Sequence, residues 1–110
     1  MSTYLYRIWP GRRELLTEGP TSEEERAISA HYEYLCGLAS RNVVLLAGRT
    51  NSNATGDFGI VIFQAAEETE AREVMEGDPA VGEGVFVADI FPFDIALVCD
   101  DVSLLGRDRT

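Results

Sequence analysis

The stretch VVLLAGRTNSNATGDFGIVIF, residues 43–63, decides the fold. It starts with an apolar run at residues 43–47, passes through a polar turn at 51–56 and ends in a second apolar run at 60–63. Each run is too short for a helix and fits a buried strand. Neither strand has a polar face. The stretch therefore predicts an antiparallel hairpin.

Two further strands are predicted near the two ends of the chain. Residues 4–9 combine aromatic and branched side chains and end at Pro10 and Gly11, a pair typical of a loop. Residues 85–91 form the other run, and Pro92 follows it. Because proline cannot donate a ladder hydrogen bond, this strand should end near a sheet edge or a bend.

A long helix is predicted between the first strand and the hairpin. Two residue pairs have the spacing of a capping box, Thr21 with Glu24 and Ser22 with Glu25. Acidic residues in this first turn suit the positive end of the helix dipole. The helix should run to about Arg41.

The apolar side of this helix contains the only histidine of the chain. At 100° per residue, Ile28, His31, Leu35 and Leu38 share an arc of about 80°. His31 is therefore expected to face inward. Asn42 can adopt the left-handed conformation that ends a helix.

A second, shorter helix is predicted over residues 67–77, and Asp78 with Pro79 is expected to end it. The residues on its apolar side are Ala71, Val74 and Met75. Asp78 follows Ala71 by seven positions and lies nearly on the same line. A carboxylate at the negative end of a helix and on its apolar side is unfavourable unless a cation or proton donor lies nearby.

The order β-α-β-β-α-β predicts an α+β fold, a ferredoxin-like sandwich with a four-stranded antiparallel sheet and two helices on one face. We expect one domain over residues 1–99 and a polar C-terminal tail or extra turn over 100–110. Two helices cover only one face of four strands, and the hairpin is apolar on both faces. The sequence therefore predicts a homodimer joined through the open sheet face.

Composition excludes several classes of function. The chain has 110 residues and a formal charge of −10, from 19 acidic and nine basic residues. This charge disfavours nucleic acids and anionic membranes as partners. All nine basic residues are arginine, and the absence of lysine excludes Schiff-base chemistry and a P-loop.

No cofactor, metal or targeting signal is expected from the sequence. Cys36 and Cys99 form no CxxC pair, and a single histidine gives no metal-ligand spacing. No GxGxxG or GxxxxGK[ST] motif occurs. No secretory signal or membrane-length apolar run is evident, which predicts a cytoplasmic protein with free thiols.

Five short motifs, in this order and spacing, resemble the YCII-related family of small dimeric α/β-barrel proteins over about residues 3–98. They are His31 through Leu35, Leu45 through Gly48, Asp78-Pro79, Gly84-Val85 and Pro92-Phe93. The resemblance implies a ferredoxin-like fold, dimerisation and a cleft that holds a histidine and an aspartate, here His31 and Asp78. The chain departs from the family pattern at Ala80, Asn42 and Arg49. The shape of its pocket and its choice of ligand are therefore not implied by the resemblance.

His31 and Asp78 are the candidate catalytic residues. Imidazole can take up or release a proton near neutral pH, and a carboxylate bound to one ring nitrogen would fix its tautomer. The alternatives are a core histidine bonded to a backbone carbonyl and an aspartate that only ends a helix.

Three further residues are candidates for substrate binding. Arg7 and Arg49 could hold a substrate carboxylate or phenolate, and the Tyr6 hydroxyl could stabilise an oxyanion. The alternatives are solvated surface arginines and a tyrosine that packs in the core or at a dimer interface.

These residues predict a cofactor-independent enzyme of the isomerase or lyase type, in which His31 and Asp78 transfer a proton on a small acid, with aromatic acids among the candidates. The alternatives are a dimeric domain that binds a small molecule or assists another protein without catalysis, and a structural module in which His31 is buried.

Overall fold

A computed structural model of the chain describes residues 1–52 and 55–105. The four predicted strands and the two predicted helices are present. The structure also contains two short helices that were not predicted from the sequence, and a 3-10 turn within the segment predicted as a tail or extra turn. The elements are β1 (Ser2–Pro10), α1 (Glu14–Glu18), α2 (Ser22–Ser40), β2 (Val44–Arg49), β3 (Gly59–Ala65), α3 (Glu68–Glu76), α4 (Pro79–Gly82), β4 (Phe86–Pro92) and η1 (Val102–Leu105).

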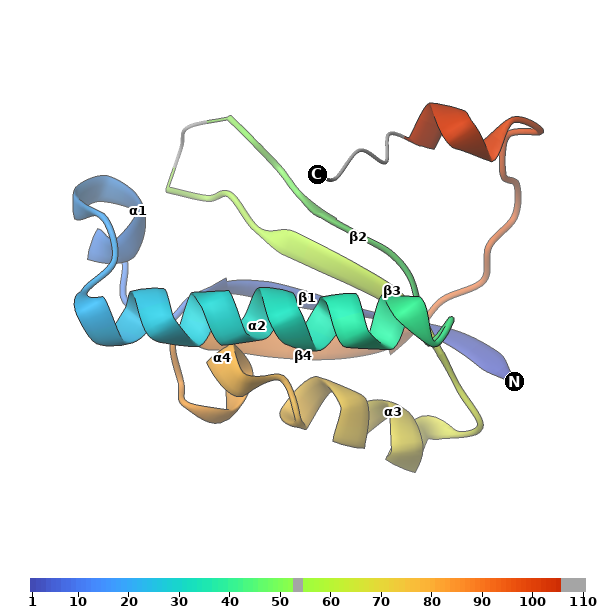
Figure 1. Cartoon of the computed structure of the whole chain (residues 1–110), viewed down its shortest axis with the longest axis horizontal. Helices are drawn as coiled ribbons and strands as arrows, with labels where there is room; N and C mark the ends of the chain where they lie inside the picture. The colour runs from blue at the N-terminus through green and yellow to red at the C-terminus, as the bar shows by residue number, and fades with distance from the viewer. Residues whose placement is uncertain (53–54, 106–110) are drawn as a thin grey trace.

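The four strands form one antiparallel sheet in the order β2-β3-β1-β4. Pro92 ends β4, which is an edge strand, as its lack of an N–H predicts. Helices α2 and α3 lie side by side over one face of this sheet (Figure 1). This confirms the predicted α+β architecture with the helices on one face.

Strand β1 alternates between a face covered by the helices and an open face. Tyr4, Tyr6 and Ile8 are buried, whereas the residues between them are partly exposed. Opposite them on β3, Val61 and Phe63 are also buried. These side chains and those of α2 and α3 form the core, because alternate strand positions point to opposite faces.

The open sheet face carries apolar side chains that no other element among the described residues covers. Alternation places Leu46, Val87 and Phe91 on this face, each between 39% and 46% exposed. Large apolar side chains left exposed on a sheet face are a common feature of interaction sites. None of the helices in residues 1–52 and 55–105 has the length and apolar character needed to span a membrane.

Beyond β4 the backbone leaves the sheet. Phe93 still donates its N–H to the carbonyl of Thr3, and the following residues extend away to η1 (Figure 1). Within the predicted tail, residues 102–105 form this turn, and Val102 and Leu104 are exposed. The described part of the tail is therefore not uniformly polar, and residues 106–110 lie outside the described ranges.

Both ends of α2 follow the predicted chemistry. Thr21, not Ser22, forms the capping box: the Glu24 N–H donates to Thr21 Oγ1 at 3.1 Å, and the Thr21 N–H donates to Glu24 Oε1 at 2.9 Å. At the other end Asn42 has φ 63°, the left-handed conformation expected of it. Part of the predicted turn at 51–56 lies outside the described residues, at 53–54.

Arg12 fastens α1 to the start of α2. Its guanidinium donates to both carboxylate oxygens of Glu24, at 2.8 and 2.7 Å, and to the carbonyl of Gly19 at 3.1 Å. These hydrogen bonds from Arg12, with the N–H of Thr21, lower the pKa of Glu24 to about 2. A five-residue helix has too few internal hydrogen bonds to hold its place alone, so this ion pair helps to position α1.

The Arg12–Glu24 pair predicts a pH-dependent contribution to stability. Because the folded-state pKa of Glu24 lies below its ordinary value of 4.5, the contribution is present above about pH 4.5 and is lost as the pH falls towards 2. We expect the difference in free energy of unfolding between the wild type and Glu24→Gln to shrink over this range, as measured by urea denaturation. Glu23→Gln, one residue earlier and outside the ion pair, is the control and should give only a small difference. A constant difference for Glu24→Gln would contradict the prediction.

Candidate active site

His31 and Asp78 are in direct contact. His31 comes from the middle of α2, and its Nδ1 lies 2.6 Å from Oδ2 of Asp78. The histidine side chain is 13% exposed and the aspartate side chain is fully buried. The Phe86 ring of β4 packs edge-on against the imidazole, with 5.4 Å between ring centroids. The structure thus brings together the two predicted catalytic residues.

Asp78 begins a helix and does not end one, which corrects the sequence-based expectation. Helix α3 stops at Glu76, and Asp78 is the N-cap of α4, with Pro79 in the first helical position. Asp78 Oδ1 accepts the N–H of Ala80 at 3.0 Å. The carboxylate therefore receives a backbone donor at the start of a helix, and the predicted unfavourable dipole does not arise.

Tyr6 lies behind Asp78 and has no exposed surface. Its hydroxyl donates to Asp78 Oδ2 at 2.7 Å. Burial, with the charge of Asp78 beside it, raises the pKa of Tyr6 far above its ordinary value, so the hydroxyl stays protonated and acts as a donor. Because it is enclosed, Tyr6 is not placed for the substrate contact expected from the sequence.

The contacts of Asp78 determine which nitrogen of His31 carries the proton. With Tyr6 and the Ala80 N–H as donors, the carboxylate is an acceptor, so Nδ1 of His31 must be the donor in their shared bond. In the neutral ring Nε2 then has a free lone pair. Within the described residues Nε2 has no protein hydrogen-bond partner. The ring can therefore accept a proton at this atom.

A cleft of about 630 Å³ lies beside His31, between α2 and strands β1, β2 and β3, with α1 at one end. Its floor includes Gly59, where a Cβ would lie 3.1 Å from Cγ1 of Ile8. The absence of a side chain at Gly59 therefore leaves room in the cleft. Most of the lining is apolar; the polar residues in it are His31, Tyr32, Cys36, Arg49, Thr50 and Asp57.

Arg49 lines the same cleft as His31. It is the last residue of β2 and pairs with Gly59 across the ladder. Among residues 1–52 and 55–105, no hydrogen bond or ion pair engages its guanidinium. The structure thus brings this predicted anion-binding residue to the cleft that contains the histidine.

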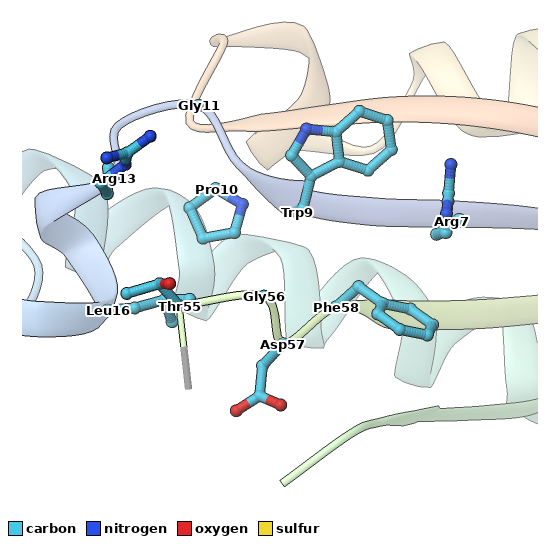
Figure 2. Close-up of a pocket in the computed structure, with 10 residues that line it drawn as sticks. All are labelled: Arg7, Trp9, Pro10, Gly11, Arg13, Leu16, Thr55, Gly56, Asp57 and Phe58. Atoms are coloured by element: carbon cyan, nitrogen blue, oxygen red, sulfur yellow. The ribbon is translucent and has the colours of Figure 1, made fainter. Parts of the chain in front are cut away.

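Arg7 is not brought to this cleft. It follows Tyr6 on β1 and so points to the open sheet face, where it donates to both oxygens of Asp89 at 3.2 and 2.8 Å. Its guanidinium lies 5.0 Å from the Trp9 ring centroid. Figure 2 shows Arg7, Trp9 and Phe58 around a second hollow of about 440 Å³. The expected role of Arg7 in binding the same substrate as His31 is therefore not supported by its position.

Two features of the site were not predicted from the sequence. The bond between Tyr6 and Asp78 joins residues 72 positions apart, and the sequence indicated only that Tyr6 could pack in the core. Cys36 is exposed and lines the cleft, a position that nothing in the sequence indicated. Over the described ranges no group of three His, Cys, Asp or Glu side chains is arranged to hold a metal ion.

Two solved structures resemble the structure of this chain. The structure is similar to that of 5-chloro-2-hydroxyhydroquinone dehydrochlorinase (TftG) from Burkholderia phenoliruptrix AC1100, solved with 2,5-dihydroxybenzoquinone; the TM-score is 0.62 and the identity 19%, over 84% of this chain and 93% of that one. A variant of SnoaB, a cofactor-independent oxygenase from Streptomyces nogalater, gives a TM-score of 0.48 and 10% identity, over 90% and 96%. At 19% identity the likeness to TftG concerns the fold alone.

Of two sequence comparisons, one identifies the family of the chain. No curated protein sequence matches the chain. The family model of the YCII-related domain, however, matches residues 12–94, which is most of the chain and includes both His31 and Asp78. The chain therefore belongs to the YCII-related domain family.

Proposed function

We propose that this protein is a cofactor-independent enzyme that transfers a proton on a small molecule bound in the cleft, with His31 as the acid–base group and Asp78 as the residue that orients it. The observation that carries the proposal is the 2.6 Å contact between Nδ1 of His31 and a fully buried carboxylate, with the same ring lining the cleft. A histidine held in one tautomer by a carboxylate is the usual arrangement of a general base.

The chemistry follows from the tautomer. Nε2 of neutral His31 takes a proton from a carbon or oxygen of the substrate, and the electron pair of the broken bond stays on the substrate. The imidazolium that forms is stabilised by the negative charge of Asp78. Return of the proton to another atom completes an isomerisation. In an elimination the electron pair instead forms a new π bond, and the leaving group departs with the pair of its own broken bond.

The cleft supports a small acid with a largely apolar body as the substrate class. Its walls are mostly apolar, and Arg49 is among the residues that line it, which supports the proposal that its guanidinium binds a carboxylate or phenolate group. The 2,5-dihydroxybenzoquinone in the TftG structure is a flat ring with acidic hydroxyl groups, so it shares the ring and the anionic oxygen of this class. Aromatic acids and phenols are therefore the first compounds to test.

The assembly that we propose is a homodimer formed through the open sheet face. That face carries Leu46 on β2 and Val87 and Phe91 on β4, the two edge strands of the sheet, and all three side chains are partly exposed. Pairing two such faces would remove this apolar surface from water.

The catalytic proposal predicts that His31→Gln abolishes proton transfer. Aromatic acids are incubated with the protein in D₂O, and deuterium uptake at carbon is followed by mass spectrometry. We expect uptake with the wild type and at least about a hundredfold less with His31→Gln, because a positioned general base contributes roughly 10²–10⁴ to the rate.

Binding of the same acids to His31→Gln, measured by calorimetry, is the control and should be retained. Equal deuterium uptake by the two proteins would contradict the role of His31. Tight binding without uptake by the wild type would instead favour a binding module without catalysis, which is the alternative function.

The role of Arg49 predicts weaker binding of anions after Arg49→Met. Loss of a charge-assisted hydrogen bond should raise the dissociation constant of an aromatic acid about tenfold or more. Arg26→Met, on the exposed side of α2, is the matched control and should leave the constant unchanged. If the two variants bind alike, Arg49 is not the anion-binding residue.

The homodimer predicts that a charge on the open sheet face prevents association. Val87→Asp should shift the chain from dimer to monomer in sedimentation-velocity experiments, because an unpaired carboxylate at an apolar interface is costly. Ser40→Asp, at the exposed end of α2, should leave the dimer intact. A wild type that sediments as a monomer at high concentration would exclude the proposed assembly.

A further inference from the structure

One oxygen of Asp78 accepts two side-chain hydrogen bonds. Oδ2 receives the hydroxyl of Tyr6 at 2.7 Å and Nδ1 of His31 at 2.6 Å, while Oδ1 receives the N–H of Ala80 at 3.0 Å. Tyr6 and His31 therefore compete for the same acceptor. We propose that Tyr6 is a positioning residue that sets the proton affinity of His31 by sharing this oxygen, and that it acts without touching the substrate.

The direction of the effect follows from charge. When His31 gains a proton, the imidazolium is stabilised by the negative charge on Asp78. A hydroxyl that donates to the same oxygen draws on that charge and weakens the bond that the oxygen can offer to the ring. Tyr6 therefore lowers the affinity of His31 for a proton, which keeps the ring neutral and available as a base.

Tyr6 is well placed to hold the pair still. It lies on β1, which is flanked by β3 and β4 in the sheet, and its ring packs in a T-shape on Phe63 with 5.7 Å between centroids. His31 and Asp78, in contrast, come from α2 and from the junction of α3 and α4. The hydrogen bond from the Tyr6 hydroxyl therefore connects Asp78 and His31 to the sheet and orients Asp78 Oδ2 towards the imidazole of His31.

The other titratable side chains near Asp78 do not change their charge while His31 titrates. Within the described residues the titratable side chains that face the carboxylate are Tyr6 from β1 and His31 and Tyr34 from α2, while β4 contributes the uncharged ring of Phe86. The Tyr34 hydroxyl donates to the carbonyl of Val74 at 2.7 Å, and burial raises its pKa. Both tyrosines thus stay neutral while His31 titrates.

Tyr4 provides a matched control on the same strand. It lies two residues before Tyr6 on the same face, is 8% exposed and packs on the same Phe63 ring at 6.0 Å. In the part of the chain that the structure describes, its hydroxyl makes no hydrogen bond. Tyr4→Phe therefore removes a hydroxyl from the same core without touching Asp78.

The experiment uses the single histidine of the chain, whose nuclear magnetic resonance signals need no assignment among others. Tyr6→Phe should raise the proton affinity of His31 about threefold to tenfold, seen as a higher titration midpoint of the ring signals. Tyr4→Phe should leave the midpoint unchanged. Nitrogen shifts should show the Nδ1–H tautomer in the wild type.

Two further variants keep the test decisive. In an Asp78→Asn background the effect of Tyr6→Phe should fall to that of Tyr4→Phe, because the two residues act through one oxygen. Should Tyr6→Phe fail to fold, 3-fluorotyrosine at position 6, a stronger donor, should lower the proton affinity of His31 instead.

Equal midpoints for Tyr6→Phe and Tyr4→Phe, an effect that persists with Asp78→Asn, or no decrease with fluorotyrosine would overturn the proposal. The inference concerns the same pair as the proposed function, but its measurement involves no substrate. A protein that lacks turnover and still shows the Tyr6 effect would therefore refute the enzyme proposal alone.

Discussion

The burial of one carboxylate is the constraint on which the site depends. Removing an ionised carboxylate from water is costly unless hydrogen bonds replace the lost hydration. Asp78, fully buried, meets this requirement with donors from three elements: Tyr6 on β1, His31 on α2 and the Ala80 N–H in α4. Fold and site are thus coupled, because the carboxylate is satisfied only when strand, long helix and short helix have packed together.

The alternation of β1 separates two chemical surfaces. Tyr6 points towards the helices and reaches the carboxylate, while its neighbour Arg7 points to the open face and pairs with Asp89. One residue of difference along the strand therefore decides between the two faces. The cleft, with His31 and Arg49, lies on the helix side, and the apolar surface that we propose for dimerisation lies on the other.

Periodic and local signals in the sequence predicted most of the fold. The hairpin, the inward face of α2 with His31 and the capping box at Thr21 all depend on residues close together in the chain, where spacing determines geometry. The family resemblance, which the match over residues 12–94 confirms, added the expectation that His31 and Asp78 share a cleft.

Long-range geometry accounts for what sequence reasoning missed. An Asp-Pro pair can follow one helix or open the next, and only the packing of α4 shows that Asp78 does the latter. The partners of Tyr6 and Arg7 lie 72 and 82 positions away, so no local pattern could identify them. Helix α1 has five residues, which is too short for a period to be recognised.

The enclosed Tyr6–Asp78–His31 network also has a consequence for protein engineering. Apolar residues of matching shape commonly replace a buried ionic group with no loss of stability, and often with a gain. A redesign that optimised only thermal resistance would therefore tend to erase this network, while the sheet and helices around it survived. If the proposed activity is correct, the trade-off between thermal stability and activity would fall on these three side chains.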